Sequence, residues 1–466
     1  MSLLVLLNLL VKPIWFLVEM AVQNEVGHAD WGMYSGVMSF AFLFIALSDL
    51  GVNQYTTQKL ASEQDRLREL YPSLFSVKLI LLIVYPILLL AAGWLWGYNE
   101  RELYFLLLLC MLNGASQLTQ FFRANFQAQQ RFKLDSLASV LDRAILLLLV
   151  GALFYFGVDI QRFIYSRFLA MVLTMLVFLL VSIKLYGWIR PKIDLKKLRE
   201  VMKFSLPFAL VTVLYSVHDK VDQVMLEKLA GEVPTGLYAA AYRIVDVFSM
   251  YLWTVLAIFF ARFAFFINDR GEKQKILDFG QVITTLPMAF ICIFMQFYGD
   301  KLFFLLKDST GEEMTTMVNC LSVLFAAVFV NSTFIIHGTL LTSTGHIQFV
   351  NKAVAVGIFL NIVMNLIFIP TYGAIAAAWS TLASFTLLGI TYLFYNQFIL
   401  KMQVPWKNIL RIYLISGATY GIFYGLTYWV APWYVNTFIA GIGYAGLSLV
   451  GGVLNVKELR SWITSK

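Results

Sequence analysis

The segment 218–222 reads His-Asp-Lys-Val-Asp and places four ionisable side chains within an otherwise apolar stretch. His218 could carry protons near neutral pH, Asp219 and Asp222 could bind a cation, and Lys220 could bind an anion. Asp219 and Asp222 share one face of a helix, whereas Lys220 is turned about 100° from Asp219. A charge at the centre of a membrane helix costs about 2.5–3.5 kcal/mol. These side chains are therefore expected to face a cavity, to pair internally or to be partly neutralised.

Further charges lie in neighbouring apolar runs. Arg243 and Asp246 are one turn apart in the run that follows, at a depth similar to that of Asp222. Lys12 and Glu19 are seven residues apart and share a face of the first run. Two interpretations stay open for this set. It forms salt bridges that lock helices together, or it lines a hydrated cavity with basic residues for an anionic substrate and acidic residues for a coupling cation.

A second tier of candidates is predicted nearer the cytoplasm. Asp142 and Arg143 point about 100° apart and are poor direct partners, and Asp49 is close enough to a helix end to reach water. A single intramembrane histidine usually has a packing or hydrogen-bonding role, although it could also relay protons. The secondary candidates are Asp49, Lys78, Asp142, Arg143, His218 and His337.

The elements that position these residues are membrane helices. The chain is 60% hydrophobic and 13% charged, with mean hydropathy +0.76, against about 25% charged residues in soluble domains. Cys110, Cys292 and Cys320 lack metal-ligand spacing and are expected as buried apolar residues, and no cofactor or metal is expected. The sequence predicts an all-α polytopic membrane protein with about fourteen transmembrane helices. Their ranges are 3–24, 32–53, 71–97, 103–123, 135–157, 162–186, 204–228, 235–262, 278–300, 315–341, 349–370, 373–397, 408–430 and 434–455.

The basic residues predict the topology. Of the 35 Lys and Arg, six fall in predicted outer segments and five inside apolar runs, which leaves 24 (35 − 6 − 5) on the cytoplasmic side. This bias predicts that both termini are cytoplasmic, and it assigns the net charge of +8 to topology and anionic lipid, not to nucleic acid. The outer six are Arg101, Arg162, Arg167, Lys228, Lys301 and Lys307, and the buried five are Lys12, Lys78, Arg143, Lys220 and Arg243.

The chain also repeats itself. The segments 31–44 and 235–248 both open a long apolar run with a Gly-x-Tyr motif, and their motif glycines are 204 residues apart (236 − 32). Units of six helices with this period form a parallel repeat, with a substrate site expected at midplane between the two halves. The predicted domains are an N-lobe at 1–187, a cytoplasmic linker at 188–203, a C-lobe at 204–400, and two further helices with a tail at 401–466.

Three ordered stretches carry a resemblance to a known family. They are "GMYSGVMSFAFLFIALSDLGVNQYTTQKLA" (32–61), "KVDQVMLEKLAGEVPTGLYAAAYRIVDV" (220–247) and "TGHIQFVNKAVAVGIFLNIVMNLIFIPTYGAIAAAWSTLAS" (344–384). The chain resembles the multidrug/oligosaccharidyl-lipid/polysaccharide (MOP) exporter superfamily, in its Wzx-type O-antigen and capsule flippase branch. The resemblance implies two six-helix lobes in a V shape, alternating access, and an oligosaccharide substrate on undecaprenyl diphosphate. It places Lys12, Lys220 and Arg243 at positions that engage the pyrophosphate.

The function expected is therefore a flippase of the bacterial cytoplasmic (inner) membrane and not an enzyme. Na⁺ or H⁺ is the expected coupling ion, at Glu19, Asp219, Asp222 and Asp246. The expected protein is monomeric, surrounded by membrane lipids, and associates with polysaccharide assembly proteins. The chain has no GxxxxGK[ST] and no Asp-x-Asp, which argues against an ATP-driven pump and a glycosyltransferase or polymerase. A cation-coupled multidrug antiporter and a lipid II flippase stay open as alternatives.

Overall fold

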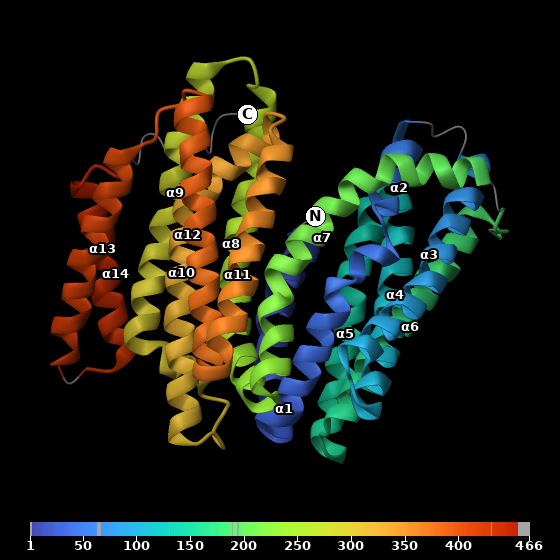
Figure 1. Cartoon of the computed structure of the whole chain (residues 1–466), viewed down its shortest axis with the longest axis horizontal. Coiled ribbons are helices and arrows are strands. Elements are labelled where there is room, and N and C mark those ends of the chain that lie inside the picture. The colour runs from blue at the N-terminus through green and yellow to red at the C-terminus, as the bar shows by residue number, and fades with distance from the viewer. Residues whose placement is uncertain are drawn as a thin grey trace. The chain divides into compact units, whose positions relative to one another are not determined.

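The computed structural model describes residues 2–62, 67–129, 131–188, 190–192, 195–429 and 431–454. Every regular element in this part of the chain is helical (Figure 1). The α-helices are α1 (Ser2–Leu43), α2 (Val52–Ser62), α3 (Leu67–Trp96), α4 (Glu100–Ala128), α5 (Phe132–Phe156), α6 (Ile160–Tyr186), α7 (Leu195–Ala230), α8 (Glu232–Phe265), α9 (Arg270–Tyr298), α10 (Gly311–Ser343), α11 (Ile347–Tyr372), α12 (Ala374–Phe394), α13 (Trp406–Thr427) and α14 (Trp433–Val450). Short 3₁₀ segments are η1 (Ile45–Ser48) and η3 (Gly299–Phe303), and η4 (Tyr395–Ile399) is π-helical.

The all-α membrane architecture is confirmed. Ten helices in the described part of the chain are long and apolar enough to cross a membrane. Large apolar side chains such as Trp94, Leu95 and Trp253 are exposed on these helices, as expected for surfaces that face lipid. The three cysteines are buried and free, as predicted.

The first two predicted helices are both present within α1, because Gly27, with φ of 80°, breaks the helical backbone between them. The end of the second needs a correction, since it lies at Leu43 and not at 53. The chain continues through η1 and a turn in which Leu50 and Gly51 have φ of 44° and 80°. These left-handed conformations stop an α-helix, so α2 begins as a separate element.

The boundary of the seventh helix also moves. The predicted helix began at 204, but α7 extends from Leu195 to Ala230 as one continuous helix, visible as a long bent ribbon (Figure 1). From Leu195 onward, the predicted cytoplasmic linker therefore continues directly into the helix that carries the 218–222 segment.

The chain forms two compact units, Met1–Ala239 and Ala240–Lys466. In the first unit, α7 and the start of α8 belong with α1–α6. Its core has one apolar cluster around Trp31, Tyr34 and Phe163 and another around Tyr71 and Phe121, whose rings stack 5.3 Å apart. The lobe boundaries drawn from the sequence repeat stay a prediction.

The second unit contains the rest of α8 and α9–α14. Small residues let α10 and α12 approach closely, because Gly338 lies against the ring of Tyr392 and Gly389 against that of Phe334. The predicted helices 349–370 and 373–397 correspond to α11 and α12, which are joined by the single residue Gly373, with φ 57°. The predicted additional pair is present as α13 and α14.

Candidate functional site

The charged segment of α7 divides its side chains between two environments. Lys220 Nζ lies 3.0 Å from Asp219 Oδ2 and 5.9 Å from the centroid of the Phe42 ring on α1. Asp219 is 45% exposed, whereas the Lys220 side chain is 17% exposed. Neighbouring residues in a helix are turned about 100° apart, yet the long Lys220 side chain reaches the Asp219 carboxylate. Lys220 therefore has a carboxylate beside it and an aromatic ring nearby.

Asp222 points the other way, into the protein. It is buried and accepts a hydrogen bond of 3.3 Å from the hydroxyl of Tyr238 at the start of α8. Tyr238 is the tyrosine of the second Gly-x-Tyr motif. His218 is within electrostatic reach of both Asp219 and Asp222. The predicted shared face of the two aspartates therefore does not give them the same surroundings.

Polar contacts continue along the seam where α1 packs on α7. The buried hydroxyl of Ser39 on α1 donates to the side-chain oxygen of Gln223 on α7. One turn further along α7, Glu227 accepts a hydrogen bond of 3.0 Å from the hydroxyl of Tyr98, which follows α3. Gly36 of α1 packs directly on the Glu227 side chain. Glu227 was missed from the sequence because it was read as part of a helix end, although its i, i+4 spacing from Gln223 places both on one face.

The two motif glycines extend this seam to the contact between α1 and the start of α8. A Cβ on Gly32 would overlap the backbone carbonyl of Glu232, and a Cβ on Gly236 would overlap that of His28. Both glycine positions and both carbonyl positions are related by the same 204-residue spacing (236 − 32 and 232 − 28). Gln23 adds a hydrogen bond of 3.0 Å to the carbonyl of Gly236. The contact is therefore reciprocal between equivalent positions of the two repeats.

A second charged centre surrounds Arg167, which was counted with the basic residues of the outer segments although the predicted helix 162–186 contains it. Asp159 caps α6 by accepting from the amide of Arg162, at 2.8 Å, so Arg167 lies about 10 Å inside the helix. Its guanidinium is 3.7 Å from Glu19 Oε1 on α1 and donates to the hydroxyl of Tyr34. Recognising the aspartate as a helix cap would have placed this arginine correctly.

Aromatic rings surround the Arg167 guanidinium. The rings of Trp15, Tyr34 and Phe163 have centroids 5.8–5.9 Å from its central carbon. Trp15 and Phe163 are themselves stacked at 6.2 Å. Such contacts stabilise a guanidinium without neutralising its charge. Arg167 thus holds a positive charge between α1 and α6, with its side chain 20% exposed.

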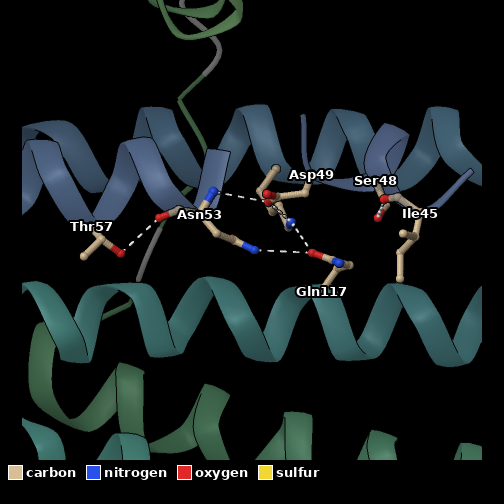
Figure 2. Close-up of polar contacts among 7 residues, drawn as sticks. Ile45, Ser48, Asp49, Asn53, Thr57 and Gln117 are labelled. Carbon is tan, nitrogen blue, oxygen red and sulfur yellow. Dashed lines mark hydrogen bonds and ion pairs between the residues drawn. The ribbon is translucent and has the colours of Figure 1, made fainter. Parts of the chain in front are cut away.

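A third polar group joins the break after α1 to α3 and α4 (Figure 2). Lys78 of α3 is fully buried and donates to Asp49 Oδ1 at 2.6 Å and to Gln117 Oε1 on α4 at 3.0 Å. Asn53 completes the group. Its backbone N–H donates to Asp49 Oδ1 at 3.2 Å, and its side-chain Nδ2 donates to Gln117 Oε1 at 3.3 Å. Lys78 and Asp49, two of the secondary candidates, are therefore brought together as an ion pair.

The remaining candidates are placed individually. Arg243 is buried and Asp246 exposed on α8, in the second unit. Asp142 and Arg143 on α5 form no ion pair with each other in the part that is described, which agrees with their predicted directions. His337 on α10 is fully buried, and neither ring nitrogen has a hydrogen-bond partner among the described residues. Lys12 belongs to α1, but its side chain lies outside the described part.

These groups together offer a particular chemistry. The first unit holds a lysine and an arginine, each beside a carboxylate and an aromatic ring, inside helices that are otherwise apolar. Ammonium and guanidinium groups suit phosphate oxygens, and aromatic faces suit sugar rings. Intramembrane ionisable residues of this kind mark substrate or ion pathways.

A chain built from two units of long apolar helices, with charged side chains held inside them, has the architecture of a polytopic membrane transporter. Residues 1–261 match the family model described as "Polysaccharide biosynthesis protein", and the chain belongs to that family.

Curated relatives agree with this assignment. The chain is 23% identical over 266 residues to the capsular polysaccharide biosynthesis protein CapF of Staphylococcus aureus, which covers 55% of this chain and 61% of CapF. It is 20% identical over 275 residues to the probable low-salt glycan biosynthesis flippase Agl15 of Haloferax volcanii, which covers 57% of this chain and 56% of Agl15. The matched region therefore spans less than two thirds of each of these relatives.

Solved structures establish the fold. The lipid II flippase MurJ in an inward closed conformation superposes with a TM-score of 0.80 at 14% identity, over 97% of this chain and 98% of MurJ. An inward-facing multidrug resistance MATE family transporter of the MOP superfamily gives a TM-score of 0.64 at 14% identity, over 84% of this chain and 97% of that one. At this identity the likeness concerns the fold alone, and it is the fold that the resemblance to the MOP superfamily implied.

Proposed function

We propose that this protein is a flippase that moves an undecaprenyl-diphosphate-linked oligosaccharide from the cytoplasmic to the outer leaflet of the bacterial cytoplasmic membrane. Membership of the polysaccharide biosynthesis family supports the substrate class. The observation that carries the proposal is the Lys220 ammonium, held inside α7 next to an aromatic ring and a carboxylate. A diphosphate would displace the half-exposed Asp219 carboxylate from the Lys220 ammonium and form charge-assisted hydrogen bonds in its place.

The diphosphate is proposed to bind Lys12, Lys220 and Arg243, the intramembrane basic residues at the positions that the family resemblance assigns to it. The lipid tail stays in the bilayer while the sugar moves, and the protein alternates between inward- and outward-open states. Na⁺ or H⁺ drives the cycle at one or more of Glu19, Asp219, Asp222 and Asp246. A cation antiporter of the same fold is disfavoured, because these basic residues would repel a cationic drug.

The first test is binding. Purified protein in nanodiscs is incubated with undecaprenyl diphosphate or with undecaprenyl monophosphate, and bound lipid is measured by native mass spectrometry. A charge-assisted hydrogen bond contributes about 1.5–3 kcal/mol, so Lys220→Ala should weaken diphosphate binding roughly tenfold to a hundredfold. Lys220→Arg should retain most of the affinity. The matched control is Lys301→Ala, which removes an exposed lysine paired with its neighbour Asp300.

The second test is export. Ala variants of the three basic residues are expressed at equal levels in a deletion strain of the source organism, and surface polysaccharide is measured. Full export by all three variants would contradict the diphosphate assignment. Restoration of growth in a strain depleted of its lipid II flippase would instead favour a peptidoglycan precursor as the substrate. Efflux of ethidium by the wild-type protein would favour the antiporter.

A further inference from the structure

One buried carboxyl group lies outside the set of residues assigned to substrate or ion. Glu227 is 8% exposed, near the end of α7. Its Oε2 atom accepts the hydrogen bond from Tyr98, whereas Oε1 is buried and has no hydrogen-bond partner among the described residues. Buried polar atoms without partners are rare in native proteins and call for a specific explanation.

The charged groups around Glu227 would not balance the negative charge of an ionised Glu227 carboxylate. The elements packed around it supply two further carboxyl groups, Glu102 from α4 and Glu232 from α8, and one ammonium, Lys228 of α7 itself. Lys228 is exposed, and no cation of the described part lies within ion-pair distance of Glu227. From α1 the neighbour is Gly36, which has no side chain to offer.

The packing prevents water from replacing that missing partner. A Cβ on Gly36 would lie 2.8 Å from Cγ of Glu227 and would overlap its carboxyl group, so α1 lies directly against the acid. The Tyr98 ring is also buried and packs edge-on against Phe40 of α1, with centroids 5.1 Å apart. A lone carboxylate in such a place costs several kcal/mol, whereas a neutral carboxylic acid hydrogen-bonded to a phenol costs far less.

We infer that Glu227 is a proton-binding site, protonated while α1 packs on α7 and deprotonated when the two helices separate at Gly36. On separation the carboxyl O–H bond breaks, the proton passes to water, and the resulting carboxylate is hydrated. Return of α1 to α7 requires that one proton be taken up again. The predicted topology places this end of α7 at the outer face, so that protons are exchanged with the outside.

The site links proton binding to the seam that the two motif glycines extend. Its role in transport rests on the proposed flippase function, but the proton site itself does not. The same seam contains Ser39–Gln223, whose hydrogen bond does not depend on a proton. It also contains Gln23, which bonds the carbonyl of Gly236 and the ring of His28, a second titratable group. Glu227 is the buried carboxyl group through which pH acts on the stability of this contact.

Infrared difference spectroscopy tests the proton directly. Purified protein in nanodiscs, without substrate, is measured in the C=O stretching region of protonated carboxyl groups. The wild type should show a band at neutral pH that is lost in Glu227→Gln and diminishes as the pH is raised. Glu100→Gln, which changes an exposed carboxyl of α4, should leave the band unchanged. Identical spectra for the wild type and Glu227→Gln would overturn the inference.

A second variant covers the case in which Glu227→Gln does not fold. Tyr98→Phe removes the hydrogen bond to the carboxyl group, so the band should remain but shift in frequency; an unchanged band would contradict the assignment. Hydrogen exchange of the α1 and α7 amides should accelerate with rising pH in the wild type more steeply than chemical exchange alone, and Glu227→Gln should abolish that excess. Lys220→Ala should leave the band in place, so a failed diphosphate assignment and a failed proton site give different results.

Discussion

The Lys78–Asp49 pair leads to a prediction about the asymmetry of a buried ion pair. Lys78 is fully buried, whereas Asp49 is 19% exposed, so the two partners differ in their access to solvent. Removing one member of a buried pair costs about 3–5 kcal/mol, because the other charge is left uncompensated. Lys78→Met leaves the more exposed charge behind and should cost about 3 kcal/mol, at the lower end of that range. Asp49→Asn leaves the fully buried ammonium behind and should cost more, about 4–5 kcal/mol.

A double-mutant cycle measures the coupling. The free energy of unfolding is determined in mixed micelles by titration with a denaturing detergent, with tryptophan fluorescence as the probe. The double variant Lys78→Met/Asp49→Asn leaves no unpaired charge. Its loss of unfolding free energy should therefore be smaller than the sum of the two single losses, with a coupling energy of at least about 2 kcal/mol. The exposed pair Lys301–Asp300, joined at 2.7 Å, is the control and should show coupling below about 1 kcal/mol. Equal effects of the two single variants, or strict additivity, would refute the reasoning.

Three further predictions concern packing and backbone geometry. Gly32→Ala should lower the free energy of unfolding by about 1–3 kcal/mol, because its methyl group meets the carbonyl of Glu232; Gly114→Ala, which meets no atom within 4 Å, should be neutral or stabilising in the same titration. Arg167→Lys should be less thermally stable than the wild type, because an ammonium has neither the planar surface nor the fork of donors that this aromatic site accommodates; an equal melting temperature would contradict that account. Gly373→Ala should cost about 1–3 kcal/mol, because its φ of 57° and ψ of −136° are suited to glycine, and unchanged stability would show that the turn relaxes.

The sequence predicted elements better than it predicted contacts. Long apolar runs identified the membrane helices, and the Gly-x-Tyr repeat identified two glycines that the structure places in close packing. The break after Leu43 escaped prediction because the residues there are as apolar as those of a helix, although the chain passes through a 3₁₀ segment and then takes left-handed conformations at Leu50 and Gly51. Hydropathy does not distinguish a helix from an apolar turn.

The side-chain environments were harder to predict for a different reason. Arg167 was counted with the outer basic residues although the predicted helix 162–186 contains it, and its depth in the helix depends on where Asp159 caps the helix. Glu227 was overlooked because its partner Tyr98 is 129 residues away in the chain. Helical spacing indicates which residues share a face, but it does not indicate which other helix covers that face. Asp219 and Asp222 show this limit most clearly, with one exposed and the other buried.

The reciprocal packing of Gly32 and Gly236 has a consequence for how such a chain could arise. Each repeat presents the same glycine to the same carbonyl of the other repeat, which is the arrangement of a symmetric dimer interface, where one patch meets its own copy. Two copies of one Gly-x-Tyr segment, related by a twofold axis, would make the same pair of glycine–carbonyl contacts. Once both copies are joined in one polypeptide, each half is free to vary, so that the position of Gln23 in one repeat is occupied by Glu227 in the other. An interface that began as two identical surfaces can in this way acquire an amide on one side and an acid on the other.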